Sequence, residues 1–200
     1  NLDISAPFYL GAQNCFYKDH GAYTGEISLS MLIECKVDYV IIGHSERRHM
    51  FYEDDKLIGK KVFNVINAGL KPILCIGETL DQKNHGKTFN IIEQQLIKGL
   101  ISVKSLDNIT IAYEPVWAIG TGLTASSEKI DEMHSFIRII LTKLYSNFNI
   151  DSVPILYGGS VNSDNASELI SINGVNGFLI GGASLDIIKF TDIVKIVNEQ

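Results

Sequence analysis

The sequence contains few of the residues that build disulfide-rich scaffolds or zinc centres. Its 200 residues include three cysteines, Cys15, Cys35 and Cys75, which are widely spaced and form no Cys-x-x-Cys pair. Small disulfide scaffolds are dense in cysteine, and structural zinc sites need several closely spaced cysteine or histidine ligands. The pattern therefore indicates reduced thiols in a cytoplasmic protein, with no metal site.

Long apolar runs and an excess of positive charge are also missing. No apolar run reaches the roughly 20 residues that span a bilayer, and no signal peptide precedes the first apolar segment. Lys and Arg number 17 against 23 Asp and Glu, giving a net charge of −6. This balance argues against a nucleic acid or a membrane as partner, and an anion would have to be bound by backbone dipoles.

The chain instead alternates short apolar runs with longer helical patterns. With 46% hydrophobic and 20% charged residues and no linker, residues 1–200 are predicted to form a single domain. Helical spacing of apolar residues predicts helices over 55–68 and 127–144. Strands are predicted over 9–14, 39–43, 72–76, 109–113, 153–157 and 177–180. This alternation is typical of a parallel sheet covered by helices.

Two parallel architectures compete, an open doubly wound sheet and a closed (β/α)₈ barrel. Polar segments follow five successive strands, beginning at Gly43, Gly77, Glu114, Tyr157 and Gly181. A barrel brings the ends of all its strands to one site. An open sheet would concentrate them at one switch point, and no Gly-x-Gly-x-x-Gly opens any helix here. The strand ends therefore favour the barrel.

Glu114 stands at the end of the apolar strand 109–113, directly before a loop containing Gly120 and Gly122. A carboxylate emerging from a poorly solvated wall is a better proton acceptor, as general base catalysis requires. A solvated Glu in a tight turn is an equally good interpretation of this segment alone.

Four longer segments carry a specific resemblance. The segments 41–48 (IIGHSERR), 112–122 (AYEPVWAIGTG), 157–161 (YGGSV) and 177–185 (GFLIGGASL) resemble signature segments of the triosephosphate isomerase family, in the same order. The resemblance implies a TIM barrel that interconverts dihydroxyacetone phosphate and glyceraldehyde 3-phosphate in glycolysis and gluconeogenesis, without a cofactor. It covers essentially the whole chain.

The resemblance also implies roles for individual residues. Glu114 matches the base, and His44 matches a neutral imidazole that polarises the substrate carbonyl; a helix beginning at Ser45 would lower its pKa. Ser45 resembles a residue that holds the base. Glu46 resembles a second carboxylate near the substrate, or alternatively a salt-bridge partner of Arg47 or Arg48.

Phosphate binding is expected from loops that follow the last strands, where (β/α)₈ proteins bind phosphate with backbone N–H groups. The residues concerned are Gly120, Ser160, Gly181 and Gly182. Residues 115–125 resemble the family's lid, whose closed form Tyr157 and Ser160 would hold. Gly86-Lys87-Thr88 has Asp81 where a nucleotide-binding loop requires Gly, so ATP binding is discarded.

The segment Phe16 to Ile27 resembles the family's dimer loop and is rich in Tyr, Phe and Gly, which predicts a homodimer. No segment matches the family's catalytic lysine and neighbouring asparagine, and six strand–helix units are counted. The chain is therefore expected to lack roughly the first two βα units and to be poorly active by itself. Two alternatives stay open: a catalytically silent phosphate-binding barrel fragment, and another phosphosugar enzyme on the same fold.

Overall fold

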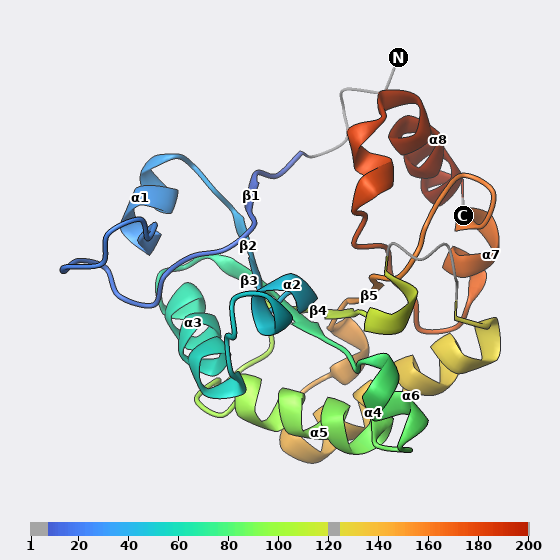
Figure 1. Cartoon of the computed structure of the whole chain (residues 1–200), viewed down its shortest axis with the longest axis horizontal. Helices are drawn as coiled ribbons and strands as arrows, with labels where there is room; N and C mark the ends of the chain where they lie inside the picture. Colours follow the sequence, from blue (N-terminus) through green and yellow to red (C-terminus); the bar gives the residue numbers. More distant parts are fainter. Residues whose placement is uncertain (1–7, 120–124, 200) are drawn as a thin grey trace.

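The computed structural model describes residues 8–119 and 125–199 and shows a parallel sheet backed by helices (Figure 1). All neighbouring strands are parallel, and they follow one another in chain order across the sheet. The strands are β1 (Gly11–Ala12), β2 (Tyr39–Ile42), β3 (Lys71–Ile76), β4 (Thr110–Tyr113) and β5 (Ile155–Tyr157). This order contains no reversal, so the sheet has no switch point and the doubly wound alternative is wrong.

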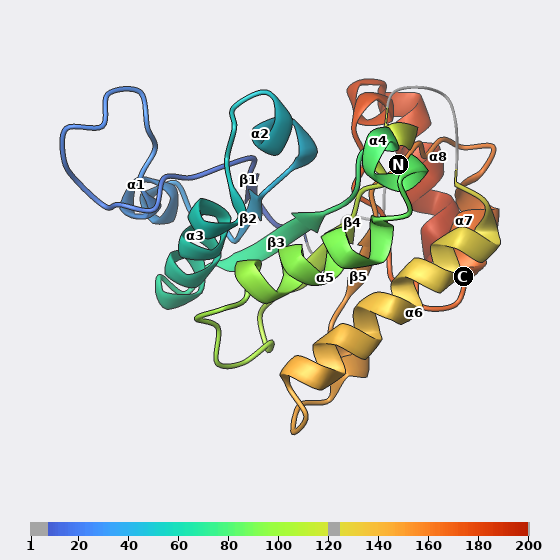
Figure 2. The same cartoon turned by 60° about the horizontal axis from the view of Figure 1, so that its bottom comes forward.

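The helices follow the strands along the chain. They are α1 (Leu29–Glu34), α2 (Ser45–His49), α3 (Asp55–Asn67), α4 (Leu80–Asn84), α5 (Thr88–Gly99), α6 (Ser127–Leu144), α7 (Ala166–Ser171) and α8 (Ile187–Asn198), with short 3₁₀ helices η1 (Val116–Ala118), η2 (Ile150–Ser152) and η3 (Gly182–Leu185). Helix α5 packs against both α3 and α6, so these three form a layer outside the strands (Figures 1 and 2). A parallel sheet backed in this way is the wall of a (β/α) barrel.

The element predictions are largely confirmed. Helix α6 has the predicted bounds and begins where the Ser126 side chain accepts a hydrogen bond from the Lys129 N–H. Helix α3 is capped by Asp54 and stops before Gly69, whose φ of +78° is unfavourable for other residues. Two predicted strands are wrong in extent. Of 9–14 only Gly11–Ala12 is a strand, and of 177–180 only Phe178 forms a bridge, to Tyr157.

The core is continuous from the strands to the helices. Val40, Leu74, Ile111 and Ile155 on four strands are completely buried, and they belong to one apolar cluster that includes residues of α3, α5 and α6. Burying a side chain of this size contributes about 1.5–3 kcal/mol. The strand ends therefore project from a rigid base. In the described ranges, no helix combines the length and the apolar character needed to cross a bilayer.

Candidate active site

A cavity of about 660 Å³ lies at the carboxyl ends of the strands. The structure brings most of the predicted site residues to it, since its walls include His44, Glu46, Glu114, Ser160, Gly181 and Gly182. Gly120 lies outside the described residues. The polar walls and the apolar side chains of Ile41, Leu179 and Ile180 form a site of the size and mixed character that small ligands need.

Glu114 follows β4 and is almost completely buried, with 2% of its surface exposed. Its Oε1 lies 3.0 Å from His44 Nε2, and its Oε2 accepts a 3.1 Å hydrogen bond from the Ser45 backbone N–H. The interpretation of Glu114 as a solvated turn residue is therefore wrong. Ser45 holds the carboxylate through its main chain, from the first position of α2.

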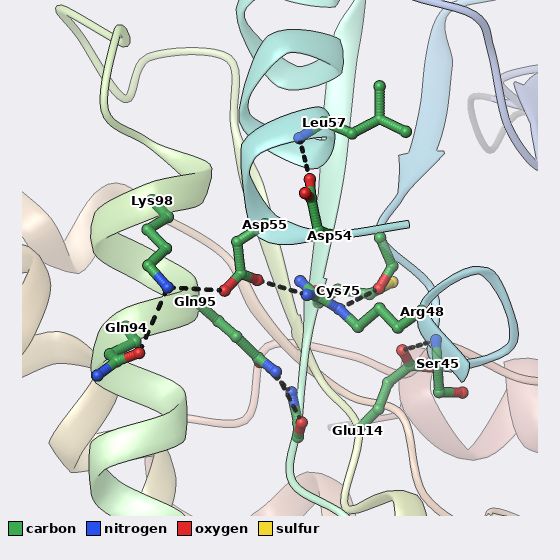
Figure 3. A network of polar contacts seen from close by, with 12 residues as sticks. Ser45, Arg48, Asp54, Asp55, Leu57, Cys75, Gln94, Gln95, Lys98 and Glu114 are labelled. Atoms are coloured by element: carbon green, nitrogen blue, oxygen red, sulfur yellow. Dashed lines mark hydrogen bonds and ion pairs between the residues drawn. The ribbon is translucent and has the colours of Figure 1, made fainter. Parts of the chain in front are cut away.

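The neighbouring strand end fits Glu114 closely. The Glu114 N–H donates to the Ile76 carbonyl at 2.8 Å, and a side chain at Gly77 would collide with the carbonyl oxygen of Glu114. The buried Gln95 amide bonds both main-chain groups of Gly77: its Oε1 accepts from the N–H at 2.8 Å and its Nε2 donates to the carbonyl at 3.0 Å (Figure 3). A glycine and a buried amide thus fix the wall behind the carboxylate.

His44 precedes α2 and caps it. Its Nδ1 accepts a 3.3 Å hydrogen bond from the Glu46 N–H, so a neutral ring carries its proton on Nε2, facing Glu114. The expected lowering of the imidazole pKa is wrong in this arrangement. The hydrogen bond with Glu114 raises the pKa of His44 above its usual value, against the opposing effect of burial. The carboxylate at contact distance is the largest influence on the pKa of His44.

The cations next to His44 are paired with carboxylates other than Glu46. Arg47 donates to Glu53, which also forms a 2.7 Å ion pair with buried Lys61. Arg48 donates to Asp55 at 2.7 Å. Glu46 keeps 68% of its side chain exposed and lies 3.9 Å from His44 Nδ1. The structure thus favours the position beside the cavity over a salt bridge with Arg47 or Arg48.

A second wall of the cavity consists of loops. Gly181 and Gly182 are exposed, and a Cβ at either position would meet no atom within 4 Å. Gly182 opens η3, so its backbone N–H belongs to the first turn, where donors lack helical acceptors. The carbonyl of Ser160 accepts from Asn165 Nδ2 at 3.1 Å, which fixes this loop.

Tyr157 lies beneath this wall and is completely buried. Its hydroxyl oxygen accepts a 3.4 Å hydrogen bond from the Ala125 N–H, at the end of the segment that resembles a lid. Burial raises the pKa of Tyr157, which keeps the hydroxyl neutral. Among the described residues, no group of three or more His, Cys, Asp or Glu side chains is placed to hold a metal ion.

Comparison with known proteins agrees with this geometry. The family model described as triosephosphate isomerase matches residues 2–197. The chain belongs to the triosephosphate isomerase family. It is 51% identical over 192 residues to the triosephosphate isomerase of Thermodesulfovibrio yellowstonii, covering 96% of this chain and 78% of that protein. The triosephosphate isomerase of Aquifex aeolicus is 50% identical over 186 residues, which cover 92% of this chain and 75% of the relative.

Membership of the triosephosphate isomerase family makes the chain an aldose–ketose isomerase by descent and confirms the barrel fold class. It does not by itself give each polar strand end a role in the chemistry. Glu78, which follows β3, turns away from the cavity: its carboxylate accepts hydrogen bonds from Tyr113 at 3.2 Å and Trp117 at 2.9 Å. Burial raises the pKa of Glu78. We assign it to anchoring η1 beside β4.

Gln95 is a supporting residue that the sequence analysis missed. It lies on the buried face of α5, three residues after Ile92 and four before Gly99, both of which are buried. The signal was present, because an amide at a core position of a helix must find buried partners. Spacing alone could not show that this partner is Gly77, 18 residues away.

Proposed function

We propose that Glu114 and His44 perform the proton transfers that interconvert dihydroxyacetone phosphate and glyceraldehyde 3-phosphate. The observation that carries this proposal is the pairing of His44 Nε2 with Glu114 Oε1 at 3.0 Å in the wall of the cavity. A buried carboxylate beside a polarising N–H matches the two needs of this reaction, a base for a carbon acid and a donor for the carbonyl oxygen.

The reaction requires Glu114 to remove a proton from the substrate carbon that bears the hydroxyl group, next to the carbonyl. The electron pair left behind forms an enediolate, and Nε2–H of His44 stabilises its oxygen. His44 then moves a proton between the two oxygens, and Glu114 returns its proton to the neighbouring carbon. No electrons are gained or lost overall, so the scheme requires no redox cofactor.

The present contacts describe Glu114 at rest. Its two oxygens receive hydrogen bonds from His44 and from the Ser45 N–H, so both are engaged by the protein. We propose that substrate replaces the carboxylate at His44 Nε2, which frees Glu114 to approach carbon. Ser45 is then the resting partner of the base, and Glu46 contributes negative potential at the cavity mouth.

The phosphate of the substrate is proposed to bind at the loop wall, through Ser160, Gly181 and Gly182. By the family resemblance Gly120, which lies outside the described residues, is proposed to take part as well. Exposed backbone N–H groups at the start of η3 suit a dianion, and the empty space at both glycines leaves room for close approach. Tyr157 is proposed to hold the neighbouring segment through Ala125.

Replacing Glu114 with Gln tests the proposal. The amide keeps the shape but cannot accept the proton, so kcat of the isomerase should fall on the order of 10²- to 10⁴-fold. Glycerol 3-phosphate, which cannot isomerise, should still bind with similar affinity in calorimetry. The same substitution at exposed Glu168 is the matched control and should leave kcat unchanged. Near-normal turnover in E114Q would refute the role of Glu114.

We further propose that the protein acts as a homodimer through the loop Phe16 to Ile27. The Phe16 N–H donates to the Ile27 carbonyl at 2.8 Å and closes the base of the loop, which projects away from the sheet (Figures 1 and 2). The Phe16 ring packs against both Tyr17 and Tyr23. Phe16 and Tyr17 are half-buried and hold Tyr23, which is 39% exposed. An exposed aromatic anchor such as Tyr23 is typical of interfaces.

A second exposed patch supports this interface. Met50, Phe51 and Tyr52 are 68%, 60% and 86% exposed, and Phe51 lines the cavity. We propose that the partner's loop covers this patch and brings its Thr24 near the site. In sedimentation experiments, Tyr23→Arg should shift the protein from dimer to monomer, whereas Ile139→Arg on the exposed side of α6 should not. A fully active monomer at micromolar concentration would contradict this proposal.

The remaining proposals concern organisation and location. One continuous apolar cluster, from Cys15 to Ile193, supports a single domain. The three cysteines are free, as is usual in a reducing compartment, which supports a cytoplasmic location. Gel filtration after limited proteolysis tests the first proposal, and fractionation of cells tests the second.

A further inference from the structure

Arg48 joins the ends of two strands behind the cavity. Its side chain is 8% exposed, and its guanidinium donates in three directions (Figure 3). Nε donates to the Gly43 carbonyl at 2.7 Å, Nη2 to the Cys75 carbonyl at 2.9 Å, and Nη1 to Asp55 Oδ1 at 2.7 Å. Arg48 is not part of the cavity lining, so this cation does not face the substrate.

The two carbonyls belong to the strands that support the acid–base pair. Gly43 directly precedes His44, and the ladder between β2 and β3 ends at the pair Ile42 and Leu74. Beyond this pair the chain turns away, because Gly43 has a φ of +75°. Arg48 therefore links the two backbones at the point where strand pairing stops, and it does so with two hydrogen bonds.

The fit around Arg48 is close on every side. A Cβ at Gly43 would lie 3.1 Å from Arg48 Nη2, so the glycine accommodates the guanidinium as well as the turn. Asp55, at the start of α3, balances the charge and is itself 3.6 Å from Lys98 Nζ on α5 (Figure 3). The position of the guanidinium is thus fixed by α3 and by both strands.

We propose that Arg48 is a positioning residue for the isomerisation: it holds the His44 strand end in register with β3, against which Glu114 packs. The Glu114 N–H bonds the Ile76 carbonyl, one residue after Cys75, so the two halves of the acid–base pair are joined through Arg48. This inference rests on the proposed function. The proposed role of Arg48 differs from a general contribution to stability, because Arg48 would act on kcat by aligning His44 with Glu114.

Lysine cannot replace this arrangement. A guanidinium is planar and rigid and directs its N–H groups at two carbonyls and a carboxylate together, whereas an ammonium is a single compact centre on a flexible chain. Misplacing catalytic groups by about 1 Å costs about 10²-fold in rate. Arg48→Lys should therefore lower kcat by about 10²-fold while KM changes by less than about threefold.

Arg138→Lys is a matched control. Arg138 on α6 also donates to a main-chain carbonyl and to an amide oxygen, Ile150 O at 2.9 Å and Asn176 Oδ1 at 3.0 Å, but it does not touch the strand ends of His44 and Glu114. We expect R138K to lower the melting temperature without changing kcat. The imidazole ¹⁵N signals of His44 should shift in R48K and stay in place in R138K, and guanidinium ions should partly restore kcat to Arg48→Ala.

Several results would overturn the inference. They are a wild-type kcat in R48K, an equal loss of kcat in R138K, or unchanged His44 signals in R48K. If R48K does not fold, Asp55→Asn keeps the arginine and removes the carboxylate that Arg48 shares with Lys98. Wild-type kcat and His44 signals in D55N would count against the proposal. Failure of the proposed function is separate, since it would appear as full activity in E114Q.

Discussion

The two walls of the cavity differ in how their polar groups are held. At the ends of β2 and β4, His44 and Glu114 contact each other and the start of α2, and Glu114 is buried. On the loop wall, Gly181 and Gly182 are exposed and a Cβ would meet no atom within 4 Å. The protein alone sets the geometry of the first wall. The second wall, where we propose that the phosphate binds, is open, so substitutions there should affect substrate binding before they affect stability.

The largest difference is expected between His44→Gln and Ser160→Ala. Removing a preorganised donor to a developing oxyanion lowers kcat by about 10²- to 10³-fold, so H44Q should retain KM and lose kcat. S160A removes one polar group from the open wall and should raise KM several-fold with kcat nearly intact. Steady-state kinetics with glyceraldehyde 3-phosphate measures both. If H44Q and S160A changed kcat and KM in the same way, the two walls would not differ in function.

The glycines of the two walls should respond to the same substitution in opposite ways. In Gly77→Ala the new methyl group meets the Glu114 carbonyl, so we expect destabilisation of about 1–3 kcal/mol or more. In Gly182→Ala it meets open space, and stability should stay within about 0.5 kcal/mol. For a chain of this size each kcal/mol lowers the melting temperature by about 2–4 °C. Equal melting temperatures for Gly77→Ala and Gly182→Ala would show that the backbone at the end of β3 can move to accommodate the methyl group.

The first wall could be predicted from sequence because its residues are strand ends. Alternating strands and helices fixed the edge at which His44 and Glu114 meet, 70 positions apart, and the barrel made that edge a single site. The partners of these residues could not be predicted in the same way. Periodicity places Gln95 on the core side of α5, but its choice of Gly77 depends on the exact approach of α5 to β3.

The pKa of His44 shows why a local argument can fail. The prediction considered the helix that begins at Ser45, and that helix is present. The dominant influence is Glu114, which comes from a different strand and lies at contact distance. Likewise, the apolar composition of residues 177–180 predicted a strand, but in the structure Phe178 forms a single bridge. Electrostatics and pairing at this level depend on three-dimensional neighbours.

A second histidine extends the comparison to a site outside the cavity. His134 on α6 is completely buried, with Nδ1 3.0 Å from the Gly174 carbonyl and Nε2 without a partner among the described residues. Burial lowers the pKa of His134, whereas the hydrogen bond with Glu114 raises the pKa of His44. The two groups therefore have opposite effects on stability as the pH falls below about 6.5, the usual pKa of histidine.

His134→Asn should reduce the loss of stability in acid. Below about pH 6.5 His134 binds a proton in the unfolded chain but stays neutral in the folded protein. The free energy of unfolding therefore falls as the pH falls towards the pKa of His134 in the folded protein. His44, with its raised pKa, works in the other direction, because its contribution is present below about pH 6.5 and lost as the pH rises through its folded value.

Asparagine keeps an N–H donor for Gly174 and does not titrate. Urea unfolding between pH 7 and 5 should thus give H134N a smaller decline, by at most about 1.4 kcal/mol per pH unit. His85→Asn, at a side chain that is 62% exposed, is the control and should follow the parent protein; parallel curves for all three proteins would contradict the assignment to His134.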